Sequence, residues 1–145
     1  MPGPSLSTGV RTRLSVMMFL QYAFNGLWFI PLATYLTRAG YAGGQVGDIY
    51  GTFAIGCIIS PFIVGMIADR FFSAQKILGV LNIVAAVLLV LAARYSVAAD
   101  GRAYVDAAGK PVLSVFYWLM LAHFVAYMPS WALTNTIAFR QMNDP

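Results

Sequence analysis

The chain has 145 residues, of which 60% are hydrophobic and only 10% are charged, and its formal net charge is +4 at pH 7. A soluble domain typically carries about 25% charged residues, so this composition excludes a soluble globular protein. The nine basic residues are scattered along the chain, which argues against a nucleic-acid partner because such a partner needs a clustered basic footprint.

Four uncharged apolar blocks organise the sequence, and all 14 charged side chains lie outside them. A helix that crosses a hydrocarbon core of about 30 Å needs roughly 20 apolar residues, and each block reaches or approaches that length. The blocks lack the alternating pattern of barrel strands, which leaves helices as the spanning elements. We therefore predict an all-α membrane protein with four transmembrane helices. The predicted helices are 14–36, 49–68, 77–93 and 112–139, within a membrane region 14–139.

The segments outside the blocks set the expected topology. Residues 1–13 precede the first helix and carry Arg11 and Arg13, and residues 140–145 begin a connection after the last helix. Four spans place both ends of the chain on one side of the membrane. Because the first helix usually dominates orientation and two arginines precede it, we expect a cytoplasmic N-terminal segment.

The first predicted helix carries Gln21, Asn25 and Trp28 at i, i+4 and i+7, a spacing that stacks them on one face. Carboxamides both donate and accept hydrogen bonds, and an indole adds a flat apolar surface with one N–H. This face can therefore bind a nucleobase or a similar planar polar solute. Alternatively, the two amides bond neighbouring helices and Trp28 fills a gap.

The last predicted helix also carries polar side chains on one face, namely His123, Tyr127, Ser130 and Thr134, at i, i+4, i+7 and i+11. Polar groups in lipid are expensive and face the bundle interior or a water-filled path. His123, the only histidine, can carry protons or bind solute; alternatively, it is a neutral ring bonded to another helix. For Asn82 in the third predicted helix we expect a hydrogen bond between helices.

Small residues accompany the second predicted helix at helical spacing, as the pairs Gly47/Gly51 and Gly56/Ser60. Such pairs let helix backbones approach closely in a bilayer. The single cysteine, Cys57, excludes an internal disulfide and a multi-cysteine metal site.

Asp69 and Arg70 follow the C-terminal end of the second predicted helix. The helix dipole disfavours an anion at that end, so the carboxylate needs a partner, either Arg70 or the N-terminus of another helix. The alternative is an ordinary charged turn.

The segment Gly65-Met66-Ile67-Ala68-Asp69-Arg70, with Lys76 shortly after, resembles the loop signature of the major facilitator superfamily between its second and third helices. Residues 71–76 depart from the general signature and resemble the variant in the nucleoside:proton symporter family. The similarity runs from about Arg13 to the end of the chain, although 25–27 departs from the more aromatic pattern of relatives. Further matching segments, in order, are Phe19-Leu20-Gln21 with Trp28, Ile58-Ile59-Ser60-Pro61, Ala126-Tyr127-Met128-Pro129 and Asn135-Thr136-Ile137.

The resemblance implies a twelve-helix transporter of a bacterial-type plasma membrane, built as two six-helix halves, that moves nucleosides inward with protons by alternating access. The four predicted helices match its first four, so we expect a fragment that lacks the other eight helices. The resemblance implies no catalytic residues, no metal and no cofactor beyond the proton as coupling ion. On this interpretation, the candidates for the solute pathway are the polar faces of the first and last predicted helices, Gln21, Asn25, Trp28, His123, Tyr127, Ser130 and Thr134. Asp69 and Arg70 become candidates for a cytoplasmic gate, where the superfamily's acid helps to latch the two halves.

Three other classes of protein compete with this interpretation. A small four-helix exporter working as a dimer fits the length, but such proteins generally need a membrane-embedded carboxylate, and here no Glu occurs and no Asp lies in a block. A non-transporting membrane scaffold or assembly subunit is the second. An intramembrane enzyme is the third, and one histidine without an acid beside it in the membrane makes neither a catalytic dyad nor a metal site.

Overall fold

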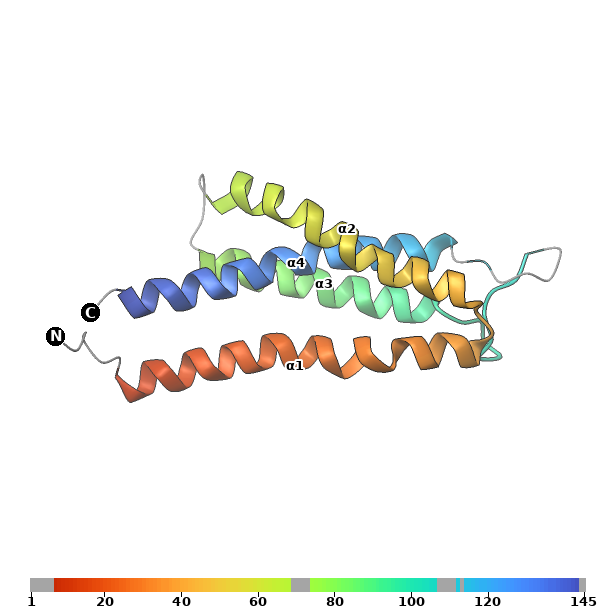
Figure 1. Cartoon of the computed structure of the whole chain (residues 1–145), viewed down its shortest axis with the longest axis horizontal. Helices are drawn as coiled ribbons and strands as arrows, with labels where there is room; N and C mark the ends of the chain where they lie inside the picture. The colour runs from red at the N-terminus through yellow and green to blue at the C-terminus, as the bar shows by residue number, and fades with distance from the viewer. Residues whose placement is uncertain (1–6, 69–73, 107–111, 113, 144–145) are drawn as a thin grey trace.

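The computed structural model describes residues 7–68, 74–106, 112 and 114–143. Within these ranges the chain forms four long helices, which confirms the prediction of an all-helical protein. The helices are α1 (Thr8–Ala39), α2 (Gly43–Ala68), α3 (Ala74–Tyr95) and α4 (Ser114–Asn143). They run side by side along one long axis, and the start of α1 and the end of α4 lie at the same end of the bundle (Figure 1). Successive helices run in opposite directions, so an even number of them returns the chain to the end of the bundle where it began.

The helix α4 is the centre of the bundle. It packs extensively against α2 and α3, whereas α1 makes far fewer close backbone approaches to any neighbour. Phe124 of α4 is completely buried and contacts an aromatic ring from α2 and two from α1, at centroid distances of 5.4 to 5.8 Å. Those rings belong to Phe53, Trp28 and Phe29. Aromatic packing therefore replaces much of the backbone contact that α1 lacks.

One glycine explains how closely α2 approaches α4. A Cβ atom built on Gly56 would lie 2.8 Å from Phe124 Cβ and 3.0 Å from the Phe124 carbonyl carbon. Neither atom can move without shifting α4. Gly47 and Gly51 have no described atom within 4 Å of their Cβ positions. Of the two small-residue pairs predicted to let helices approach closely, only the one with Gly56 therefore does so.

The backbone of α1 is supported where Pro31 interrupts it. Proline removes one backbone donor and crowds the preceding turn. The Tyr50 hydroxyl of α2 accepts a hydrogen bond from the Ala33 N–H at 3.1 Å and donates one to the Phe29 carbonyl at 2.7 Å. These two backbone groups would bond to each other in a regular α-helix. Tyr50 is therefore inserted into the hydrogen-bond ladder of α1 and fixes α1 to α2.

The end of the bundle opposite the termini is closed by hydrogen bonds around Ser96. The Tyr41 hydroxyl donates to the Ser96 carbonyl at 2.8 Å, and the Tyr35 and Ser96 hydroxyls lie 2.9 Å apart. The Ala103 N–H donates to the Ala39 carbonyl at 2.8 Å. Burial raises the pKa of the Tyr41 hydroxyl, which keeps it protonated as a donor. The end of α1 is thus tied to α3 and to the segment that follows α3.

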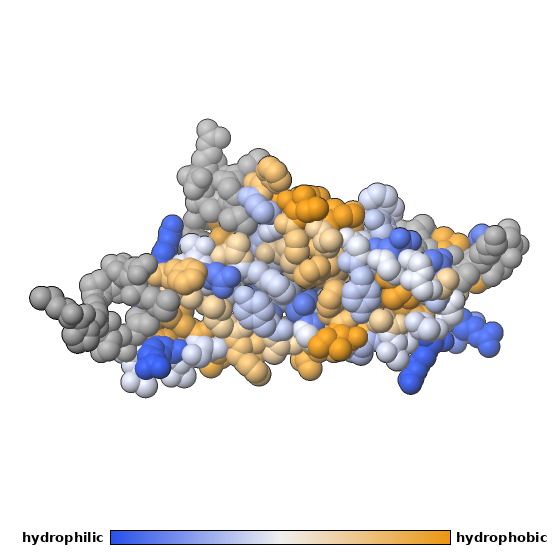
Figure 2. All heavy atoms as spheres, in the orientation of Figure 1, coloured by the Kyte–Doolittle hydropathy of each residue, from blue (hydrophilic) through white to orange (hydrophobic). Residues whose placement is uncertain are grey.

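The surface is typical of a protein embedded in lipid. Figure 2 shows hydrophilic residues at both ends of the bundle and hydrophobic residues over much of the length between them. Within the described residues, three helices are long and apolar enough to cross a membrane, namely Thr8–Ala39, Gly43–Ile63 and Gln75–Tyr95. The helix α4 has 30 residues, but its polar and aromatic face lowers its mean hydropathy. A fourth crossing therefore stays a prediction.

We expect Gly56→Ala to destabilise the bundle by about 1–3 kcal/mol, because the added methyl group overpacks a contact with fixed backbone. The check is the midpoint temperature at which the protein loses its monodisperse form in detergent. Gly51→Ala is the matched control, since it adds the same methyl group to the same helix in open space. Equal midpoints for the two variants would contradict the close approach at Gly56.

Candidate functional site

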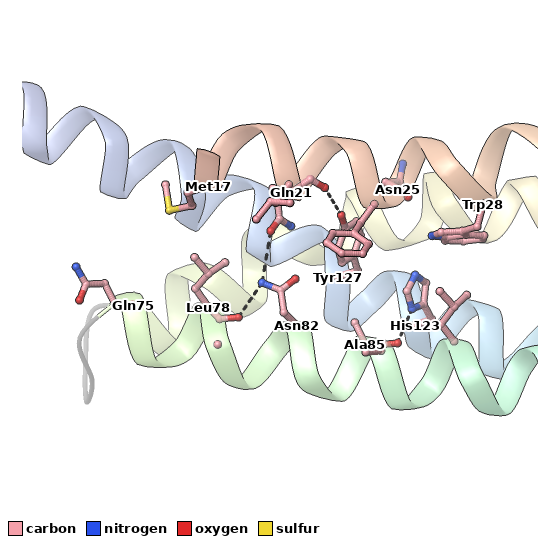
Figure 3. Close-up of a pocket in the computed structure, with 15 residues that line it drawn as sticks. Met17, Gln21, Asn25, Trp28, Gln75, Leu78, Asn82, Ala85, His123 and Tyr127 are labelled. Carbon is pink, nitrogen blue, oxygen red and sulfur yellow. Dashed lines mark hydrogen bonds between the residues drawn. The ribbon is translucent and has the colours of Figure 1, made fainter. Parts of the chain in front are cut away.

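A cavity of about 540 Å³ lies between α1, α3 and α4. It exists because α1 stands apart from α3 while both helices contact α4. Its volume is within the range of small-molecule sites, about 300–1,000 Å³. Its polar and aromatic lining consists of Gln21, Phe24, Asn25, Trp28, Gln75, Asn82, His123 and Tyr127, and the remainder is Met17, Leu20, Leu78, Gly79, Ala85, Ala86 and Leu89. Figure 3 shows these side chains converging from the three helices.

The three residues predicted to share one face of the first helix all line this cavity. Gln21 is nevertheless engaged in bonds that join helices. Its Nε2 donates to the Ser130 hydroxyl. Figure 3 shows the other two bonds, in which its Oε1 accepts from Asn82 Nδ2 at 3.4 Å and its carbonyl oxygen accepts from the Tyr127 hydroxyl. Asn25 differs from Gln21, because its buried Oδ1 has no hydrogen-bond partner among the described residues.

The predicted face of the last helix is divided between the cavity and the protein interior. His123 and Tyr127 line the cavity. Ser130 and Thr134 are fully buried and lie outside the described lining, and each donates to a carbonyl of α4 itself, at 2.6 and 2.7 Å. Ser130 reaches the site indirectly, because it accepts the hydrogen bond from Gln21. The four residues therefore share a helix face without sharing an environment.

Trp28 is held in place by two rings of α4. Its indole stacks on Phe124 with 5.8 Å between centroids and meets the His123 ring edge-on at 5.3 Å. Trp28 and Leu89 also line a second cavity of about 550 Å³ that continues along α1 and α3 towards Tyr35 and Ser96. Trp28 thus stands at the junction of the two spaces.

Two polar residues of α3 line the cavity in addition to the predicted set, Gln75 and Asn82. Asn82 makes the expected bond between helices, to Gln21, and a second bond to the Leu78 carbonyl at 3.0 Å. Gln75 and Asn82 are seven residues apart with Gly79 between them, a spacing that places all three on one helix face. The spacing of these three residues is visible in the sequence, and it identifies the face of α3 that is directed towards α1.

The described lining of the cavity contains no Asp, Glu, Lys or Arg side chain. Within the same described ranges, no group of three or more His, Cys, Asp or Glu side chains is placed to hold a metal ion. The two gate candidates, Asp69 and Arg70, lie outside the described residues. An uncharged cavity with amides and aromatic rings suits a neutral, planar, polar solute.

The family model described as nucleoside H+ symporter matches residues 8–145. Three curated relatives come from Escherichia coli (strain K12): YegT, which is provisionally named as a nucleoside transporter (41% identical), a xanthosine permease (31%) and the nucleoside permease NupG (23%). The matches cover 90–93% of this chain but only 28–29% of each relative, so the chain spans less than a third of their length. No solved structure matches it. The extent of the family match shows that the chain belongs to the nucleoside H+ symporter family.

Proposed function

We propose that these residues form the N-terminal four helices of a secondary transporter that takes up nucleosides with protons by alternating access. The observation that carries the proposal is the uncharged cavity of amides and aromatic rings between α1, α3 and α4, in a chain of the nucleoside H+ symporter family. Transport makes and breaks no covalent bond, so the proposal assigns no catalytic residue and no cofactor.

The chemistry of the cavity fits a nucleoside in three respects. The Trp28 ring offers an aromatic surface to a base, and stacking of this kind is worth about 1–3 kcal/mol. Asn25 and His123 present groups that can pair with the edges of a base or with sugar hydroxyls. Nucleosides such as uridine, adenosine and cytidine are uncharged at neutral pH, so they can enter a site without a counter-charge at little electrostatic cost.

The remaining parts of the proposal concern the whole transporter. The relatives are more than three times the length that this chain matches, which leaves room for eight further helices. The exposed large apolar side chains of α1 give those helices, or lipid, a surface to cover; they include Phe19, Phe24, Leu27 and Ile30. We place the protein in a bacterial-type plasma membrane with the shared end of α1 and α4 in the cytoplasm, as the arginines before α1 favour.

The test is uptake of radiolabelled uridine into proteoliposomes that contain the full-length transporter. We expect saturable uptake that rises when the outside is made acidic relative to the inside, because inward proton flow then drives the solute. The 145-residue chain alone is expected to show no uptake, since it supplies only part of the proposed solute pathway. Uptake by that chain, or no response of the full-length protein to a proton gradient, would contradict the proposal. A protein without any flux would favour the scaffold alternative.

Replacement of the α1 residues tests the solute site. Trp28→Ala removes the stacking surface and Asn25→Ala removes an amide without a described partner, so each should weaken uridine binding by about 1–3 kcal/mol, or roughly five-fold to a hundred-fold. Gln21→Ala should also lower thermal stability, because Gln21 bonds Ser130 and Asn82. Thr136→Val, at an exposed residue of α4 that bonds its own helix, is the control. Unchanged uridine affinity in all three variants would indicate that Gln21, Asn25 and Trp28 serve packing and not solute binding.

The gate proposal for Asp69 and Arg70 rests on the resemblance and on the helix dipole. Asp69→Asn keeps the shape of the side chain and removes its charge, which weakens a charge-assisted contact worth roughly 1.5–3 kcal/mol. The state closed to the cytoplasm should lose population. In the full-length transporter, labelling of pathway cysteines from the cytoplasm should rise while uptake falls. Labelling and uptake at wild-type levels would make Asp69 an ordinary solvated turn residue.

A further inference from the structure

The imidazole of His123 has one ring nitrogen in use and one that is free. Nδ1 lies 2.8 Å from the Ala85 carbonyl oxygen, and since a carbonyl can only accept, Nδ1 carries the hydrogen. A neutral imidazole with one N–H has an acceptor lone pair on its other nitrogen. Nε2 is that atom, and it has no partner among the described residues although His123 is only 3% exposed. Figure 3 shows it pointing towards α1, between Asn25 and Trp28.

Asn25 adds a second acceptor to the same cavity. Its side chain is 8% exposed, and its Oδ1 is likewise buried without a partner in the described part of the chain. A buried acceptor left unpaired destabilises the empty cavity, and a donor from a bound molecule removes that cost. Both atoms belong to residues that line one cavity from opposite sides, α1 and α4, so one bound molecule can reach both.

Four hydrogen bonds already occupy donors around this cavity. The Tyr127 hydroxyl donates to Gln21, and the Asn82 amide donates to Gln21 and to Leu78. Gln21 Nε2 donates to Ser130. Among the described lining residues, the two buried side-chain atoms without a partner are both acceptors. A molecule that binds there can satisfy these two atoms only by donating hydrogen bonds to them.

We propose that His123 Nε2 and Asn25 Oδ1 accept hydrogen bonds from the solute, and that this acceptor pair selects solutes with donor groups at matching positions. The inference rests on the proposed nucleoside transport and deepens it. In a nucleoside the donors are the ribose hydroxyls or the N–H of the base. Trp28, edge-on to His123 at 5.3 Å, holds an aromatic surface next to the acceptor.

The experiment measures the affinity of the full-length transporter for uridine and for analogues that each lack one donor: 2′-deoxy-, 3′-deoxy-, 5′-deoxy- and N3-methyluridine. We expect wild-type protein to bind at least one analogue about five-fold to a hundred-fold more weakly than uridine. His123→Phe keeps a ring and removes the acceptor. It should weaken uridine binding and abolish the penalty for one analogue, while penalties for the others persist. Asn25→Leu should do the same for its own donor.

The analogue that loses its penalty distinguishes a ribose hydroxyl from a base N–H. Thr136→Val, outside the cavity, is expected to retain every penalty. A His123→Phe protein that keeps the full set of penalties would overturn the inference, and so would wild-type protein that binds all the analogues as tightly as uridine, a measurement that needs no variant to fold. If wild-type protein binds no nucleoside, the proposed function fails and the inference fails with it.

Discussion

The hydrogen bonds of Gln21 hold α1 to the rest of the bundle, and the geometry of the cavity depends on them. A polar side chain inside an apolar bundle needs partners because no bulk water is available to satisfy it. Gln21 has three, through its amide nitrogen, its amide oxygen and its backbone carbonyl. These bonds reach both α4 and α3 from one residue. They fix the distance between α1 and α3 at mid-length, where the two helices make little direct contact.

Two further sets of hydrogen bonds attach α1 to the rest of the bundle. Tyr50 is inserted into its backbone near Pro31, and Tyr41 and Tyr35 tie its end to Ser96. All of these are specific polar contacts, whereas α2 and α4 meet by close packing at Gly56. The bundle therefore contains a densely packed part, in which α2 and α3 each pack against α4, and one helix, α1, that is attached at a few points. The cavities on both sides of Trp28 follow from that difference.

The sequence predicted the helices well because uncharged apolar blocks of this length have few alternatives. It also predicted that Gln21, Asn25 and Trp28 face one space, since helical periodicity places residues on a face regardless of the neighbours. Periodicity does not say which neighbour covers each part of that face. For this reason Ser130 and Thr134 are buried in the protein interior and do not line the cavity, although they share a face of α4 with His123. Gly51 and Gly56 likewise look equivalent in sequence, and only the position of Phe124 distinguishes them.

The polar residues of the cavity divide into two groups by what their hydrogen bonds already do. Gln21, Tyr127 and Asn82 bond to one another, to the Ser130 hydroxyl or to backbone, so these hydrogen bonds hold helices together. Asn25 and His123 each keep one acceptor without a partner in the described part of the chain, and an acceptor buried in a low-dielectric interior is costly until something donates to it. The same residue types therefore serve structure in one group and recognition in the other. Substitutions in the first group should act mainly on stability, and those in the second on which solute is bound.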